Sequence, residues 1–148
     1  MLAAGGPVAW LSWVGVLPFV AMQVRLEPAA LCERSTLVVV GEITGFEAYW
    51  TPAGGVERLF DVAVESTHRG ALPTEPLRVA VPGGRMGEVT QIVEDSPELL
   101  VDHRYLLLLA PADTGWRVVG LQQGVFPLSH EPGAEAVALA KLGACLAK

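Results

Sequence analysis

Two pairs of neighbouring residues, Asp102-His103 and Ser129-His130, are of the types that nucleophilic catalysis uses. A serine nucleophile needs a base beside it and a carboxylate that orients the base. The chain has no Gly-x-Ser-x-Gly sequence, which presents such a serine in many hydrolases. Because adjacent residues of a strand point to opposite faces, neither pair is assembled by its spacing alone. A small hydrolase is therefore the third of three functions that the sequence leaves open.

Metal binding would need histidine, cysteine or carboxylate ligands, and the sites that a sequence reveals use short spacings. The three histidines His68, His103 and His130 are 35 and 27 residues apart along the chain. Four carboxylates do occur between residues 94 and 102, but without the Asp-x-Asp-x-Asp-Gly order of a calcium loop. The sequence therefore predicts no metal site and no cofactor.

Two short segments are the best candidates for binding contacts. Tyr49-Trp50 precedes a Pro-Gly turn, and tyrosine and tryptophan are favoured at protein interfaces. Gly83-Gly84-Arg85 is a glycine-rich loop whose backbone amides could in principle hold an anion. The alternative is that the aromatic pair caps the fold and that the glycines only connect strands. Because loops carry contacts more often than strands do, we predict a binding surface at Tyr49, Trp50, Gly83, Gly84 and Arg85.

Composition limits the class of protein and of partner. The 148 residues include 10 Lys+Arg and 16 Asp+Glu, which gives a net charge of −6 without a basic cluster. Nucleic acid is not an expected partner, because its phosphates need a face of Lys and Arg. A hydrophobic content of 51% and a mean hydropathy of +0.42 exclude a disordered acidic tail. The length suits about one domain.

The segment before the first charged side chain, Arg25, has an apolar centre from Val8 to Met22. Such a centre is typical of a secretory signal peptide, although no Lys or Arg precedes it here. A membrane anchor, which needs about 20 apolar residues, is the second interpretation, and a buried helix of the domain is the third. We assign residues 1–31 to a signal peptide or membrane anchor with a short linker, and residues 32–148 to the folded domain.

The chain has two cysteines, Cys32 just after the apolar segment and Cys145 near the C-terminus. If the chain is exported, these two can form one disulfide, and two buried thiols are the alternative. Residues 134–148 are rich in Ala, Leu and Lys, with Ala138, Leu142 and Cys145 on one face of a helix. A disulfide between Cys32 and Cys145 would therefore return a terminal helix to the start of the domain.

Between these ends the chain consists of short apolar runs at intervals of about ten residues. In one of them Phe60, Val62 and Val64 share a face, and this period of two predicts a half-buried strand. Glycine or proline follows most runs, with turns expected at residues 51–55 and 112–115, and no helical period separates the runs. We expect a closed β-barrel or a sandwich, with strands at residues 36–40, 59–65, 77–81, 89–93, 105–110, 116–119 and 125–126. The first strand resumes at Ile43, with a bend or bulge expected at Gly41.

The landmarks of these runs have a specific order: Cys32, Gly41-Glu42, His68-Arg69-Gly70, Val81-Pro82-Gly83-Gly84, Arg104-Tyr105-Leu106-Leu107-Leu108 and Gln123-Gly124-Val125-Phe126. Over residues 32–128 this order resembles a group of exported bacterial domains and the netrin-like domains, whose OB-type barrel is shared with tissue inhibitors of metalloproteinases. The resemblance implies a five-stranded Greek-key barrel with helical segments at its side and a protein-binding role. Inhibitors of that family chelate zinc through an N-terminal Cys-x-Cys. Cys32-Glu33-Arg34 lacks the second cysteine, so the resemblance does not extend to that mechanism.

Together these observations predict a mainly β chain, an OB/netrin-like closed Greek-key barrel with a C-terminal α-helix. The function that we expect is an exported, non-catalytic module that binds a protein partner in the cell envelope or the extracellular space. If the segment from Val8 to Met22 stays attached, the alternative is a membrane-tethered structural domain.

Overall fold

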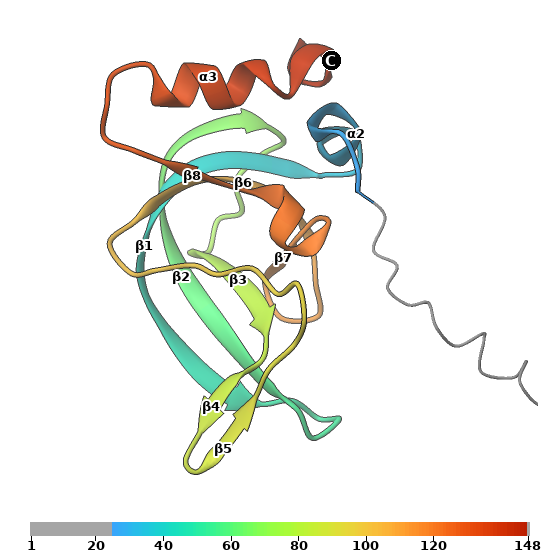
Figure 1. Cartoon of the computed structure of the whole chain (residues 1–148), viewed down its shortest axis with the longest axis vertical. Helices are drawn as coiled ribbons and strands as arrows, with labels where there is room; N and C mark the ends of the chain where they lie inside the picture. The colour runs from blue at the N-terminus through green and yellow to red at the C-terminus, as the bar shows by residue number, and fades with distance from the viewer. Residues whose placement is uncertain (1–24, 148) are drawn as a thin grey trace, which may run out of the picture.

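The computed structural model describes residues 25–147, so the apolar segment from Val8 to Met22 and its two interpretations lie outside the described residues. Within residues 25–147, no helix has the length and hydropathy needed to cross a bilayer. Figure 1 labels the α-helices and strands. In chain order the elements are α2 (Pro28–Glu33), β1 (Leu37–Trp50), β2 (Val56–Arg69), β3 (Leu77–Pro82), β4 (Gly84–Met86), β5 (Val89–Gln91), β6 (Arg104–Pro111), β7 (Trp116–Val118), the 3-10 helix η1 (Leu121–Gly124), β8 (Val125–Leu128), α3 (Ala134–Ala140) and the 3-10 helix η2 (Gly143–Ala147).

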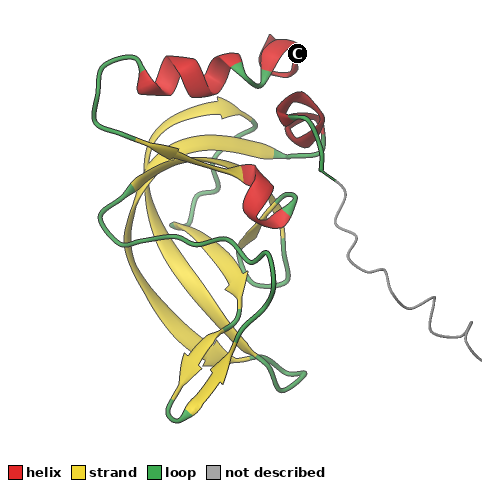
Figure 2. Cartoon of the chain, in the orientation of Figure 1, coloured by secondary structure: helices red, strands yellow, loops and turns green. Residues whose placement is uncertain are grey.

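Five strands close into a barrel in the order β1-β2-β3-β7-β6, with β6 returning to β1. All these neighbours are antiparallel except β3 and β7, which run parallel where Val79 pairs with Trp116. Strand β8 adds to β6, and β4 pairs with β5 as a hairpin at the opposite end of the barrel from α2 and α3 (Figure 2). The predicted mainly β fold, a closed OB-like barrel followed by a C-terminal helix, is confirmed.

The barrel interior is an apolar cluster built by alternate residues of the strands. Phe60 is fully buried there with Val62, and Val64 packs against the cluster, which confirms the face predicted for this run. Leu37 and Val39 enter from β1. The period of two thus assigns these side chains to the inside of the closed sheet.

A second apolar cluster, which we call the helical cover, lies outside the barrel against β1 and β6. Val38 and Val40 of β1 point outward into it and are fully buried by α2, α3 and η2. The predicted disulfide between Cys32 and Cys145 is present, and it joins α2 to η2 across 113 residues of sequence. In Figure 1 the blue helix α2 and the red C-terminal helices lie side by side at this end of the barrel.

Strand β1 continues past Gly41, as predicted, and its register with β2 shifts between Val40 and Gly41, where a bend or bulge is expected. The strand extends further than predicted, to Trp50. A Cβ at Gly41 would lie 2.7 Å from Val62 Cγ1 and 2.8 Å from the Ala63 carbonyl oxygen, so the glycine allows β2 to approach closely. The last strand, predicted at residues 125–126, continues through Pro127 to Leu128 as β8. Proline is tolerated there because β8 pairs only with β6 among the described strands.

The C-terminal helix is shorter than the predicted range of residues 134–148. Helix α3 ends at Ala140, and Gly143, with a φ of +63°, begins the separate turn η2. This positive φ favours glycine and interrupts a helix. Ala138, Leu142 and Cys145 are nevertheless all buried in the helical cover, as their spacing predicted.

Candidate binding site

A groove of about 960 Å³ crosses β2 and β3 between two turns, the β1–β2 turn and the β6–β7 turn. The β1–β2 turn is held by the Thr51 amide, which donates to the Gly55 carbonyl at 2.8 Å. In the β6–β7 turn, the Ala112 amide donates a hydrogen bond to the Gly115 carbonyl at 3.0 Å. Both turns fall where proline and glycine predicted them. We call this hollow the groove, and its lining comprises Leu26, Arg34, Tyr49, Thr51, Pro52, Glu57, Ala80, Pro82, Pro97, Pro111, Ala112, Asp113, Thr114, Arg117, Val118, Gly120, Leu121 and Gln123.

The lining of the groove is mostly apolar, but it includes charges of both signs. Two cations, Arg34 and Arg117, are matched by two anions, Glu57 and Asp113. Because these charges balance, the groove has no electrostatic preference for a polyanion. Such a surface suits a ligand that brings apolar groups together with a few polar ones.

Tyr49 stiffens one wall of the groove. Its hydroxyl donates a hydrogen bond to Glu57 Oε1 of the neighbouring strand. Burial, followed by this hydrogen bond and the charge of Glu57, raises the pKa of Tyr49 to about 12. The phenol therefore stays protonated at neutral pH and acts as a fixed donor.

The five residues predicted to bind are brought to the same end of the barrel, but they are divided between two hollows. Tyr49 lines the groove, while Gly83, Gly84 and Arg85 line a second hollow of about 720 Å³. Trp50 is 49% exposed and lines neither of them. The binding role of these residues stays a prediction.

The amide of Gly83, the first glycine of this pair, is not available to hold an anion. The Gly83 amide is already used, because it donates to the Val56 carbonyl at 2.7 Å. The Gly83 carbonyl instead accepts a hydrogen bond from Arg58 Nε at 3.0 Å. A Cβ at Gly84 would lie 2.9 Å from Arg58 Cγ, so this glycine leaves space for the arginine side chain. The glycines therefore position an arginine.

Sequence reasoning did not identify Arg58, although a signal was present. Arg58 lies two residues before Phe60 on β2, so the same alternation places both side chains on the inward face. An arginine on the inward face of a barrel strand needs a partner or an opening. Here it lies at the mouth of the barrel, with its guanidinium 5.4 Å from the centre of the Phe60 ring.

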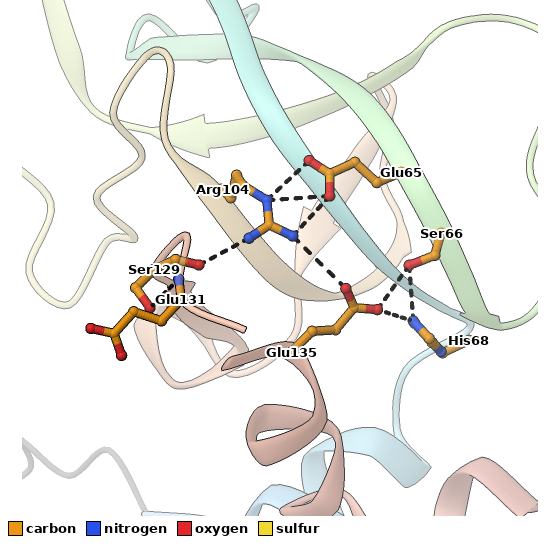
Figure 3. A network of polar contacts seen from close by, with 7 residues as sticks. All are labelled: Glu65, Ser66, His68, Arg104, Ser129, Glu131 and Glu135. Atoms are coloured by element: carbon orange, nitrogen blue, oxygen red, sulfur yellow. Dashed lines mark hydrogen bonds and ion pairs between the residues drawn. The ribbon is translucent and has the colours of Figure 1, made fainter. Parts of the chain in front are cut away.

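A polar network connects helix α3 to the barrel wall (Figure 3). His68 Nε2 lies 3.0 Å from Ser66 Oγ and 3.2 Å from Glu135 Oε2. Arg104 donates to both oxygens of Glu65 and lies 3.8 Å from Glu135 Oε1. A catalytic triad places the imidazole between serine and carboxylate through two different nitrogens, whereas a single nitrogen faces both groups here. The network thus fixes the helix on the barrel.

The histidines considered for hydrolase chemistry lie elsewhere. His103 and His130 are both exposed, and within residues 25–147 neither imidazole is hydrogen-bonded to a serine. In the same part of the chain, no three His, Cys, Asp or Glu side chains gather closely enough to hold a metal ion.

Comparison with known proteins adds no family to this description. No protein-family model matches the chain, and no curated protein matches it either. The OB-like assignment of this domain therefore rests on its strand order and closure.

Proposed function

We propose that this chain is an exported, non-catalytic binding module that holds a polypeptide segment of a partner protein in the groove. The observation that carries the proposal is the groove itself, an apolar surface with balanced charges between two turns. In OB barrels the face of the second and third strands and these same turns contact extended ligands. The balanced lining and the net charge of −6 disfavour an oligonucleotide. The mostly apolar lining with charges of both signs suits a polypeptide segment, which brings apolar and charged side chains together.

Two further features support this role. Apolar side chains ringed by polar ones are typical of the centre of a protein interface. The disulfide supports export, because such bonds persist in oxidising compartments. The resemblance to netrin-like domains, which bind proteins, points to the same function.

Photo-crosslinking from the groove tests the proposal. A photoreactive amino acid replaces Thr114 in the full chain, and in a matched sample it replaces Thr74, an exposed threonine outside the groove lining. We expect the Thr114 sample to crosslink a discrete protein from the exported fraction, and the Thr74 sample to crosslink none. Equal crosslinking from both positions would reject the groove as the contact surface.

Blocking variants give the second part of the test. Thr114→Trp fills the groove, whereas Thr74→Trp adds the same side chain outside it. The crosslinked protein should bind the Thr114→Trp chain at least about tenfold more weakly than wild type, a loss of about 1.4 kcal/mol. It should bind the Thr74→Trp chain normally. Mass spectrometry of the mature N-terminus then distinguishes a secreted module from a tethered one.

A further inference from the structure

The second hollow, which we call the arginine hollow, contains the guanidinium of Arg58. The protein contacts this group through its Nε atom and through one of its faces. Arg58 Nε donates to the Gly83 carbonyl, and the guanidinium lies over the Phe60 ring. Neither terminal nitrogen of Arg58 has a hydrogen-bond partner within residues 25–147. Partial burial lowers the pKa of Arg58 from its ordinary value, and electrostatic attraction by Glu98 opposes this effect. Arg58 therefore presents its two terminal nitrogens, with their N–H groups uncommitted, from a fixed position.

The remaining lining of the arginine hollow combines a second cation with exposed apolar groups. Arg85 is anchored by its Nε, which donates to the Gly87 carbonyl at 3.2 Å. Phe46 is 51% exposed and Ile92 is 89% exposed at this site. The lining contains two cations, Arg58 and Arg85, and one anion, Glu98, so its net charge is positive. The net charge of the whole chain, by contrast, is −6.

The edge of the hairpin adds a backbone component. Residues Val89–Gln91 of β5 pair only with β4 among the described strands. Thr90, Gln91 and Ile92 line the hollow, so it continues along this strand. An unpaired edge can accept an extended polypeptide through main-chain hydrogen bonds.

We propose that the arginine hollow binds an acidic side chain of a partner polypeptide, an Asp or Glu next to an apolar residue. A carboxylate matches the planar fork of Arg58, and bidentate pairs of this kind are short and specific. Phe46 and Ile92 then cover the neighbouring apolar side chain. This proposal rests on the proposed function in one respect, because it assumes that the ligand is a protein.

Titration of two matched peptides tests the inference on the full chain. The probes are acetyl-Gly-Phe-Glu-Leu-Gly-amide and the same peptide with Gln in place of Glu, and the observable is the Nε–Hε signal of Arg58 in NMR spectra. We expect the Glu peptide to shift this signal and to bind at least about fivefold more tightly than the Gln peptide. Equal binding of the two peptides, or no shift with either, would overturn the inference.

Variants separate this site from the groove. Arg58→Lys keeps the charge but loses the fork, and it should weaken the Glu peptide about fivefold or more. Lys141→Met, which removes one positive charge just after α3 and outside the hollow, should leave binding unchanged. Unchanged binding by Arg58→Lys would also overturn the inference. Thr114→Trp should not affect the peptide, so failure of the groove proposal and failure of this one give different results.

Discussion

The barrel interior and the helical cover are both apolar, yet they are built in different ways. The interior takes alternate side chains from strands and from the loop residue Leu99. The helical cover consists of the outward-facing residues of β1 and β6 together with the segments that pack on them. These segments come from the two ends of the described chain. A covalent bond between Cys32 and Cys145 joins those segments.

The lengths of the helices explain why the cover needs that bond. Helix α2 has 6 residues and α3 has 7, and isolated helices shorter than about 12 residues are marginal in water. Their stability must therefore come from packing, from the disulfide and from the polar network at Glu135. The comparison shows that strand pairing forms the interior, whereas tertiary contacts hold the cover.

Removal of the disulfide should have the largest effect of the changes considered, and it should destabilise the helical cover more than the barrel interior. The disulfide closes a loop between two residues 113 positions apart in the chain. In the chain-entropy model, the Cys32→Ser, Cys145→Ser double variant should therefore lose about 5 kcal/mol of its free energy of unfolding. Hydrogen exchange should show earlier opening of the Leu142 amide in the cover than of the amides of β2 and β3. Equal acceleration at both sites would mean that cover and interior unfold as one unit.

Truncation of one large side chain in each region tests how far the two are independent. Phe60→Ala in the interior should lower the free energy of unfolding by about 4 kcal/mol, because a fully buried aromatic ring leaves a cavity. Leu142→Ala in the cover should cost about 3 kcal/mol. Urea unfolding measures both losses. Exchange of the β2 and β3 amides should accelerate strongly only in Phe60→Ala, and the reverse result would contradict the comparison.

Gly41→Ala tests the contact between strands β1 and β2. The added Cβ would meet Val62 Cγ1 and the Ala63 carbonyl, one of which is backbone, so the strands must separate slightly. Overpacking of this kind costs about 2 kcal/mol, measured by urea unfolding. Gly54→Ala is not a clean control, because Gly54 has a positive φ. Gly45→Ala is the better control, because a Cβ there would lie 4.0 Å from Asp61 Oδ2, an ordinary contact distance. Equal losses for Gly41→Ala and Gly45→Ala would show that close approach is not the reason for the glycine.

The polar network should produce the smallest effect, and it should depend on pH. The hydrogen bonds from Arg104 lower the pKa of Glu65 below its ordinary value of 4.5, against a smaller opposing effect of burial. The unfolded state therefore binds a proton more readily, so this contribution is complete above about pH 4.5 and is lost as the pH falls through the lowered pKa. Because the pair is partly exposed, the contribution should stay below about 1 kcal/mol.

Thermal unfolding between pH 2 and pH 7 measures this contribution. Glu65→Gln should unfold more easily than wild type at pH 7 and should lose less stability on acidification. Glu75→Gln, which changes an exposed loop glutamate, serves as the control. If both variants follow the wild-type curve, the pair between Glu65 and Arg104 does not stabilise the fold measurably.

The parts of the fold that local pattern could predict are those that local chemistry determines. The alternation at Phe60 and Val62 identified an interior face, and the turns at residues 51–55 and 112–115 followed from proline and glycine. The second half of β1 was missed because its exposed residues, such as Thr44 and Glu47, lack a regular apolar period. Pairing with β2 makes that segment a strand, and this information lies in another part of the chain.

The candidate sites depended even more on distant contacts. Tyr49 and Arg85 were identified from residue type, but nothing local assigned them to different hollows. Arg58 was missed because its role comes from Gly83 and Gly84, 25 and 26 positions further along the chain.

The amino-acid sequence by itself determined which side chains leave water and at what period, and therefore the mainly β class and the capacity for one disulfide. Tertiary structure decided the closure of the barrel, the joining of both chain ends over β1 and β6, and the conversion of a glycine loop into a support for Arg58. The physical reason is that burial and strand propensity are properties of neighbouring residues, whereas a groove or a held guanidinium exists only when segments far apart in sequence come into contact.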